Sequence, residues 1–133
     1  MELFRNKEWK NREVQMMGPL QLAYVGDAVY EMYIRNYLIE NKNAKVNQLH
    51  RLATHYVKAK AQSDILWRIE SELTDEEKTI VRRGRNAKSY SVPKNAKLSD
   101  YRNATALEAL IGFLFLEKRD DRLKEVLDMT VVD

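Results

Sequence analysis

Two long segments of this chain are apolar at most positions, and each contains an isolated carboxylate. The first covers residues 19–40, and its charged interruptions at Asp27, Glu31 and Arg35 recur every four residues, so that they form one narrow stripe of a helix. The second covers about residues 99–117, where Glu108 is the one charge between Arg102 and Glu117. Helices this apolar have to be covered by other helices. We therefore expect both segments in the core, with the first as its buried centre.

The remaining pattern predicts further helices and no strands. Four glycines and two prolines in 133 residues are too few for the turns of a β-sandwich or β-barrel. Apolar positions at helical spacing predict helices over residues 46–61, 63–69 and from 120 onward. Thr74 and Glu77 form a capping-box pattern for a helix to about Arg83, and Ser99 or Asp100 is the expected cap of the second apolar segment. The sequence predicts an all-α fold of six or seven helices, in a single domain over residues 1–133 with a polar N-terminal arm at 1–17.

Several classes of protein are excluded by what the sequence lacks. There is no cysteine for a disulfide or a thiolate metal site, and the four isolated glycines form neither a dinucleotide-binding motif nor a P-loop. His50 and His55 stand about 140° apart around a helix, which is too far for one metal. The longest apolar run, residues 109–116, is far short of the roughly 20 residues of a membrane span. We expect a cytoplasmic protein that does not enter a membrane.

Asp27 and Glu108 are the first candidate site. A lone carboxylate inside an apolar helix is normally paired or bound to a cation, because its burial costs several kcal/mol. With no cysteine and two histidines, a pair of carboxylates would suit Mg²⁺ or Mn²⁺. The alternative is that each acid faces solvent or pairs with a neighbour, as Glu31 can with Arg35, and periodicity alone favours this alternative.

A basic segment over residues 82–97, RRGRNAKSYSVPKNAK, is the second candidate site. It has six cations and no acid, so the rest of the chain carries a net charge of −3. Lysine, arginine and serine side chains are those that contact phosphate and sugar oxygens. A solvated loop is the alternative. The candidate nucleic-acid-binding residues are Arg82, Arg83, Arg85, Lys88, Lys94 and Lys97. A metal site beside a phosphate-binding segment indicates phosphodiester hydrolysis.

Four stretches of the sequence resemble the ribonuclease III family. The stretch LAYVGDAVYE, residues 22–31, is similar to the family's signature helix. The stretch ATALEALIG, residues 104–112, is similar to the second family helix. The stretches RGRNAKS, residues 83–89, and VPKN, residues 92–95, look like a loop of the branch that has no separate double-stranded-RNA-binding domain.

The resemblance implies an all-helical ribonuclease III-like endonuclease domain that forms a homodimer. It implies an endoribonuclease that cleaves double-stranded RNA with Mg²⁺, for which Mn²⁺ can substitute, and that leaves 5′-phosphate and 3′-hydroxyl ends. Asp27 and Glu108 match two metal-binding and catalytic acids of the family. In the branch concerned, the implied substrate is the precursor of bacterial large-subunit (23S) ribosomal RNA.

The chain departs from the family pattern at three positions. Where the family has acids, four residues before Asp27 and three before Glu108, this sequence has Ala23 and Thr105, and Leu20 replaces a further Glu. Whether the site binds one metal ion or two therefore remains open. A non-catalytic dimeric RNA-binding relative is the main alternative, and a helical protein-interaction or DNA-binding module is another. Retention of both isolated acids favours the enzyme.

Overall fold

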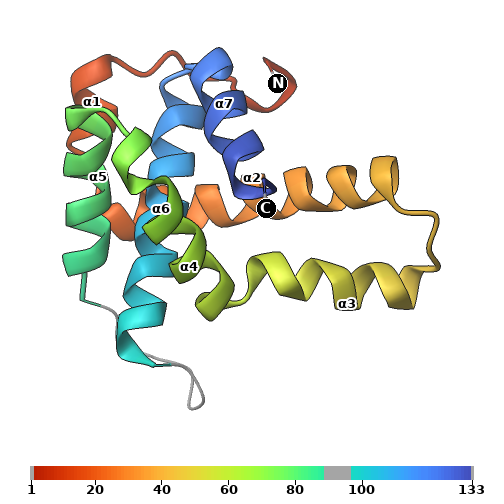
Figure 1. Cartoon of the computed structure of the whole chain (residues 1–133). Coiled ribbons are helices and arrows are strands. Elements are labelled where there is room, and N and C mark those ends of the chain that lie inside the picture. The colour runs from red at the N-terminus through yellow and green to blue at the C-terminus, as the bar shows by residue number, and fades with distance from the viewer. Residues whose placement is uncertain (1, 89–96, 133) are drawn as a thin grey trace.

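The computed structural model describes residues 2–88 and 97–132, which form seven α-helices and no β-strand (Figure 1). The helices are α1 (Asn11–Gln15), α2 (Pro19–Asn41), α3 (Val46–Val57), α4 (Ala59–Ile69), α5 (Asp75–Asn86), α6 (Leu98–Leu116) and α7 (Asp120–Thr130). Short 3₁₀ turns occupy Glu2–Phe4 and Glu70–Glu72. The all-α fold predicted from the sequence is confirmed.

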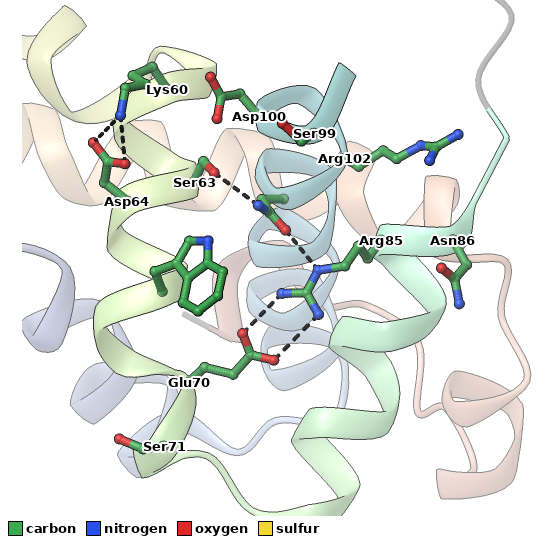
Figure 2. Close-up of a pocket in the computed structure, with 12 residues that line it drawn as sticks. Lys60, Ser63, Asp64, Glu70, Ser71, Arg85, Asn86, Ser99, Asp100 and Arg102 are labelled. Carbon is green, nitrogen blue, oxygen red and sulfur yellow. Dashed lines mark hydrogen bonds and ion pairs between the residues drawn. The ribbon is translucent and has the colours of Figure 1, made fainter. Parts of the chain in front are cut away.

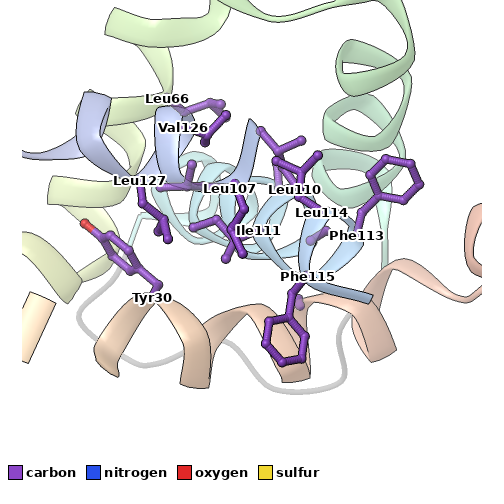
Figure 3. Packing of buried hydrophobic residues seen from close by; sticks show 14 of the residues in the cluster. Tyr30, Leu66, Leu107, Leu110, Ile111, Phe113, Leu114, Phe115, Val126 and Leu127 are labelled. Atoms are coloured by element: carbon purple, nitrogen blue, oxygen red, sulfur yellow. The ribbon is translucent and has the colours of Figure 1, made fainter. Parts of the chain in front are cut away.

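Helix α6 is the centre of the domain. Its buried residues face every direction around the helix axis, and α2, α4, α5 and α7 pack around it. Figure 3 shows this core, in which Leu107, Leu110 and Leu114 of α6 lie among side chains of the surrounding helices. The expectation that the first apolar segment is the buried centre is therefore wrong. That position belongs to the second segment, which is the more continuously apolar of the two.

Helix α2 is buried on one side only. It pairs with the returning helix α3 to form a hairpin that projects from the rest of the domain (Figure 1). Its buried face includes Leu22, Tyr30 and Ile34, whereas large apolar side chains elsewhere on the helix are exposed. These exposed residues are Leu20, Tyr24, Met32 and Ile39. One helix of the hairpin thus presents an apolar surface that no other part of residues 2–88 and 97–132 covers.

Three helix boundaries differ from those expected. The helix predicted over residues 46–61 ends at Val57, because Lys58 has an extended backbone (φ −66°, ψ 153°) and α4 begins at Ala59. Helix α5 continues to Asn86 rather than ending near Arg83. Helix α6 begins at Leu98, so the N-cap position is Lys97, whose side chain makes no capping hydrogen bond. Ser99 and Asp100, the expected caps, lie inside the helix.

The predicted capping box at the start of α5 is present and is joined to a buried ion pair. Thr74 Oγ1 accepts from the Glu77 amide, and the Glu77 carboxylate accepts from the Thr74 amide. The same carboxylate, 1 % exposed, accepts hydrogen bonds of 2.7 and 2.9 Å from Arg122 of α7. Burial by itself would raise the pKa of Glu77, but the bonds from Arg122 and Thr74 outweigh it and lower the pKa. This cluster fastens α5 to α7.

The N-terminal arm packs against the domain as well. The guanidinium of Arg5 is buried and donates to the carbonyl of Phe115 and to Asp120, at the junction of α6 and α7. In the part of the chain that the structure describes, no helix is both long enough and apolar enough to cross a membrane.

Candidate active site

The candidate site is built where α2 crosses α6 with backbone against backbone. A Cβ placed on Gly26 would lie 1.7 Å from the carbonyl oxygen of Glu108, and one on Gly112 would lie 1.9 Å from that of Leu22. Only glycine fits at either position. This close contact between the two helices explains why a glycine lies inside each of them. Because Asp27 follows Gly26, this crossing brings Asp27 next to Glu108.

The two carboxylates interact across the crossing. Asp27 is exposed, whereas Glu108 is half-buried and accepts a 3.2 Å hydrogen bond from Gln62 Nε2 through its Oε2. Burial first, and then the neighbouring Asp27 carboxylate, raise the pKa of Glu108 to about 8. Two like charges in a partly desolvated place are unfavourable unless a cation lies between them or one is protonated. An oxygen-rich pair of this kind fits a hard divalent cation.

The positions where the family has further acids contribute no charge here. Ala23 is buried in the core, and the Thr105 hydroxyl donates to the Tyr101 carbonyl one turn earlier in α6. His50 and His55 lie on the exposed side of α3. Among residues 2–88 and 97–132, no group of three or more histidine, cysteine, aspartate or glutamate side chains could hold a metal. The protein ligands available at the crossing are therefore two carboxylates.

The basic segment is divided by the structure into bound and exposed cations. Arg83 donates to the backbone carbonyls of Gln15 and Met17, at 2.6 and 2.9 Å. Arg85 donates to Asn103 and forms an ion pair with Glu70 at 2.9 Å. The exposed cations are Arg82, Lys88 and Lys97, and Lys94 lies outside the described residues. The sequence did not distinguish these groups, because α5 was expected to end before it reached Arg85.

A groove of about 1010 Å³ lies between α4 and the junction of α5 with α6 (Figure 2). Asn103 joins its walls, because it accepts from Arg85 Nε at 2.7 Å and donates to the hydroxyl of Ser63 at 2.9 Å. Trp67 of α4 lines the groove and is 76 % exposed. Lys60, which pairs with Asp64, and Arg102 add cations that sequence reasoning did not select. The groove also contains the carboxylates of Asp64, Glu70 and Asp100, so its lining carries charges of both signs.

A family model described as the Ribonuclease III domain matches residues 20–119, and the chain belongs to this family. The matched range contains both apolar helices, the basic segment and both carboxylates. Members of the family are endoribonucleases that act on double-stranded RNA and depend on a divalent metal.

Over nearly its whole length the chain is similar to bacterial proteins called Mini-ribonuclease 3. It is 47% identical to the one from Thermoanaerobacter sp. over 132 residues, which are 98% of this chain and 93% of that protein. It is 44% identical to the one from Clostridium tetani over 129 residues, covering 96% and 85% of the two chains. The match to the one from Staphylococcus aureus is 44% over 124 residues, or 92% of each chain.

A solved structure supports the same assignment. The crystal structure of a protein from Fusobacterium nucleatum superposes with a TM-score of 0.79 at 32% identity, over 90% of this chain and 95% of that one. The chain is therefore an endoribonuclease with a ribonuclease III fold, and the resemblance inferred from the two apolar helices is confirmed. This finding favours the enzyme over the non-catalytic alternative.

Proposed function

We propose that Asp27 and Glu108 form the catalytic centre and together hold Mg²⁺, for which Mn²⁺ can substitute. The observation that carries this proposal is the close crossing of α2 and α6, which sets the half-buried Glu108 beside a second carboxylate and so raises its pKa. A divalent cation relieves that repulsion and takes the place of the proton. With two protein carboxylates available, the remaining ligands of the cation are water and phosphate oxygens.

The two acids differ in environment and therefore in task. A divalent cation held by Asp27 and Glu108 would supply an activated water and would balance the charge that develops on a phosphate group. Asp27 is exposed, so it is the acid that a bound duplex can reach directly. Glu108 is held by Gln62 and by the packing of α6, so it provides the fixed ligand. Hydrolysis then leaves a 5′-phosphate and a 3′-hydroxyl.

Removal of the metal tests this assignment. Cleavage of a long RNA duplex should cease in excess EDTA and return when Mg²⁺ or Mn²⁺ is added back. Denaturing gels and end-labelling of the products provide the measurement, and a DNA duplex of the same sequence is the control that should stay intact. Cleavage at the full rate in EDTA would contradict a metal-dependent centre.

We propose that the exposed cations of the basic segment hold the RNA backbone. Arg82, Lys88 and Lys97 are free to reach phosphates, and Lys94 belongs to the same segment. Arg83 and Arg85 already bind protein atoms, so we propose that they hold the segment in place rather than contact RNA. A-form RNA presents phosphates and 2′-hydroxyls to side chains far more than readable base edges. Contacts of this kind bind duplexes with little regard to sequence.

Replacing Arg82, Lys88 and Lys97 together by Ala should weaken duplex binding and leave the melting temperature unchanged. Each lost phosphate contact should reduce the slope of log affinity against log salt by about 0.9, on the duplex-DNA scale. Fluorescence anisotropy at several salt concentrations measures both quantities. Replacing Lys42, Lys45 and Arg51 near the α2–α3 turn by Ala removes the same charge and should leave the slope as it is. If both triple variants lost the same affinity, the RNA would be held by the overall charge of the protein rather than by contacts with these three side chains.

We also propose that the protein works as a homodimer, because cleavage of both strands needs two centres related by symmetry. Helix α2 offers the surface for it. Leu20, Tyr24 and Met32 are 42, 83 and 59 % exposed, and their spacing places them on one face of the helix. A monomer rarely leaves such a row of large apolar side chains in water.

Sedimentation should give twice the mass of the chain at micromolar concentration. Changing Tyr24 and Met32 to Glu should convert the protein to monomers, because buried unpaired carboxylates would cost several kcal/mol at the interface. Phe4→Glu is the control, since Phe4 is similarly exposed but lies on the N-terminal arm. A dimer that survives the double change would place the interface elsewhere.

The cellular substrate that fits this proposal is the precursor of 23S ribosomal RNA in the bacterial cytoplasm. Similarity to the Mini-ribonuclease 3 proteins over nearly the whole chain supports it.

A further inference from the structure

Gln62 is a buried polar side chain that touches Glu108 and that neither the motifs nor the family acids point to. It lies on α4, is 2 % exposed, and donates both hydrogens of its amide nitrogen. One goes to the carbonyl oxygen of Val57 at 2.8 Å and the other to Glu108 Oε2 at 3.2 Å. The amide therefore connects a candidate metal ligand to the end of α3.

The break between α3 and α4 provides this anchor. The extended backbone of Lys58 ends the helix and leaves the last carbonyl groups of α3 in need of donors. Gln62 donates to the Val57 carbonyl, and Tyr30 of α2 donates to the neighbouring Tyr56 carbonyl at 2.8 Å. Side chains of α2 and α4 thus donate to the last carbonyl groups of α3. One of these side chains, Gln62, also donates to Glu108 at the candidate site.

The orientation of the amide follows from its neighbours. Val57 O and Glu108 Oε2 are both acceptors, so the NH₂ group has to face them, and Oε1 bonds to neither. Oε1 is buried, and no group in the described parts of the chain donates to it. A buried carbonyl without a donor is costly and uncommon. It is the kind of acceptor that a water entering with a cation can satisfy.

We propose that Gln62 is a positioning residue of the metal site: its amide nitrogen holds the Glu108 carboxylate in place, and its Oε1 accepts a hydrogen bond from water that accompanies the divalent cation. The inference rests on the proposed function, because it takes Glu108 as a ligand. It also explains how a site with two protein carboxylates can be rigid. The neutral amide fixes the orientation of one carboxylate without adding a third negative charge.

The test is the affinity of the RNA-free protein for Mn²⁺, measured by titration calorimetry. Gln62→Met keeps the length of the side chain and removes both functions, and should raise the Kd for Mn²⁺ about 10- to 100-fold, as losses of outer-shell partners do. Gln62→Asn keeps the amide but shortens the side chain by one methylene group, so that it should no longer bridge Val57 and Glu108 and should lose affinity similarly. In cleavage assays kcat should fall while KM for RNA stays near the wild-type value. Ser63→Ala is the matched control, since it removes the acceptor for Asn103 at the next position of α4 and should leave the affinity unchanged.

Two reference measurements separate the possible failures. If Glu108→Gln binds Mn²⁺ as tightly as the wild type, the metal site itself is wrongly assigned, and the role of Gln62 fails with it. If Glu108→Gln loses the metal while Gln62→Met and Gln62→Asn retain wild-type affinity, the site stands and the positioning role is overturned. The rise in melting temperature on adding Mn²⁺ gives the same comparison for a variant that is less stable without metal.

Discussion

Asp27→Asn is expected to lower the rate of duplex cleavage about 100- to 1,000-fold while the fold stays intact. The change keeps the shape of the side chain and removes the charge that, with Glu108, would balance a divalent cation. Losses of this size follow when an electrostatic contact to the reacting phosphate is removed. The rate is measured on duplex RNA at saturating Mg²⁺, with the circular dichroism spectrum and melting temperature recorded for the same sample.

The matched control for that experiment lies one turn further along α2. Glu31→Gln makes the same change in charge on the same helix, but Glu31 pairs with Arg35 at 3.1 Å at the surface. An exposed pair of this kind contributes at most about 1 kcal/mol, so this variant should cleave normally. Normal cleavage by Asp27→Asn would show that the centre lies elsewhere. Equal losses in both variants would mean that the charge of α2 matters rather than the position of Asp27.

Gly26→Ala is expected to have the largest effect on stability. Its Cβ would fall 1.7 Å from a backbone oxygen of α6, and a backbone atom cannot turn away as a side chain can. The helices would have to separate, and we expect a loss at or above the upper end of the ~1–3 kcal/mol typical of overpacking. Because the displaced atom belongs to Glu108, cleavage should be lost even at temperatures where the variant remains folded.

Gly18→Ala is the comparison for that prediction. A Cβ there would meet only the end of the Gln21 side chain, at 3.4 Å, so the melting temperature should stay close to that of the wild type. Thermal unfolding of the two alanine variants measures the difference. If Gly26→Ala melts like Gly18→Ala, the close approach of α2 and α6 is not a feature of the folded protein.

The sequence was sufficient for the parts of the fold that depend on hydrophobic pattern. The apolar segments, the capping box at Thr74 and the isolated acids Asp27 and Glu108 all carry strong local signals, and the helices follow them. The break at Lys58 has no such signal, since no glycine or proline lies nearby. It is held by side chains from α2 and α4, and the bond from Tyr30 to the Tyr56 carbonyl depends on the packing of α2 against α3.

The remaining differences have the same origin. Gln62 looks like any polar residue of an amphipathic helix until α6 is packed against it. Arg83 and Arg85 look like free cations until the N-terminal arm and Glu70 are placed beside them. Charge in a sequence shows which groups are present, and only tertiary structure shows which of them are already paired.

The proton held by Glu108 makes the site sensitive to the ratio of magnesium ions to protons. With a pKa of about 8, the carboxyl group is mostly protonated at neutral pH, so a cation that binds there has to displace the proton. Apparent metal affinity should therefore fall by about tenfold for each pH unit below 8, and added Mg²⁺ should restore it. Acidification and loss of magnesium would then slow RNA cleavage in the same way, because both leave Glu108 protonated. Added Mg²⁺ would offset a lower pH, and a higher pH would offset a lower concentration of Mg²⁺.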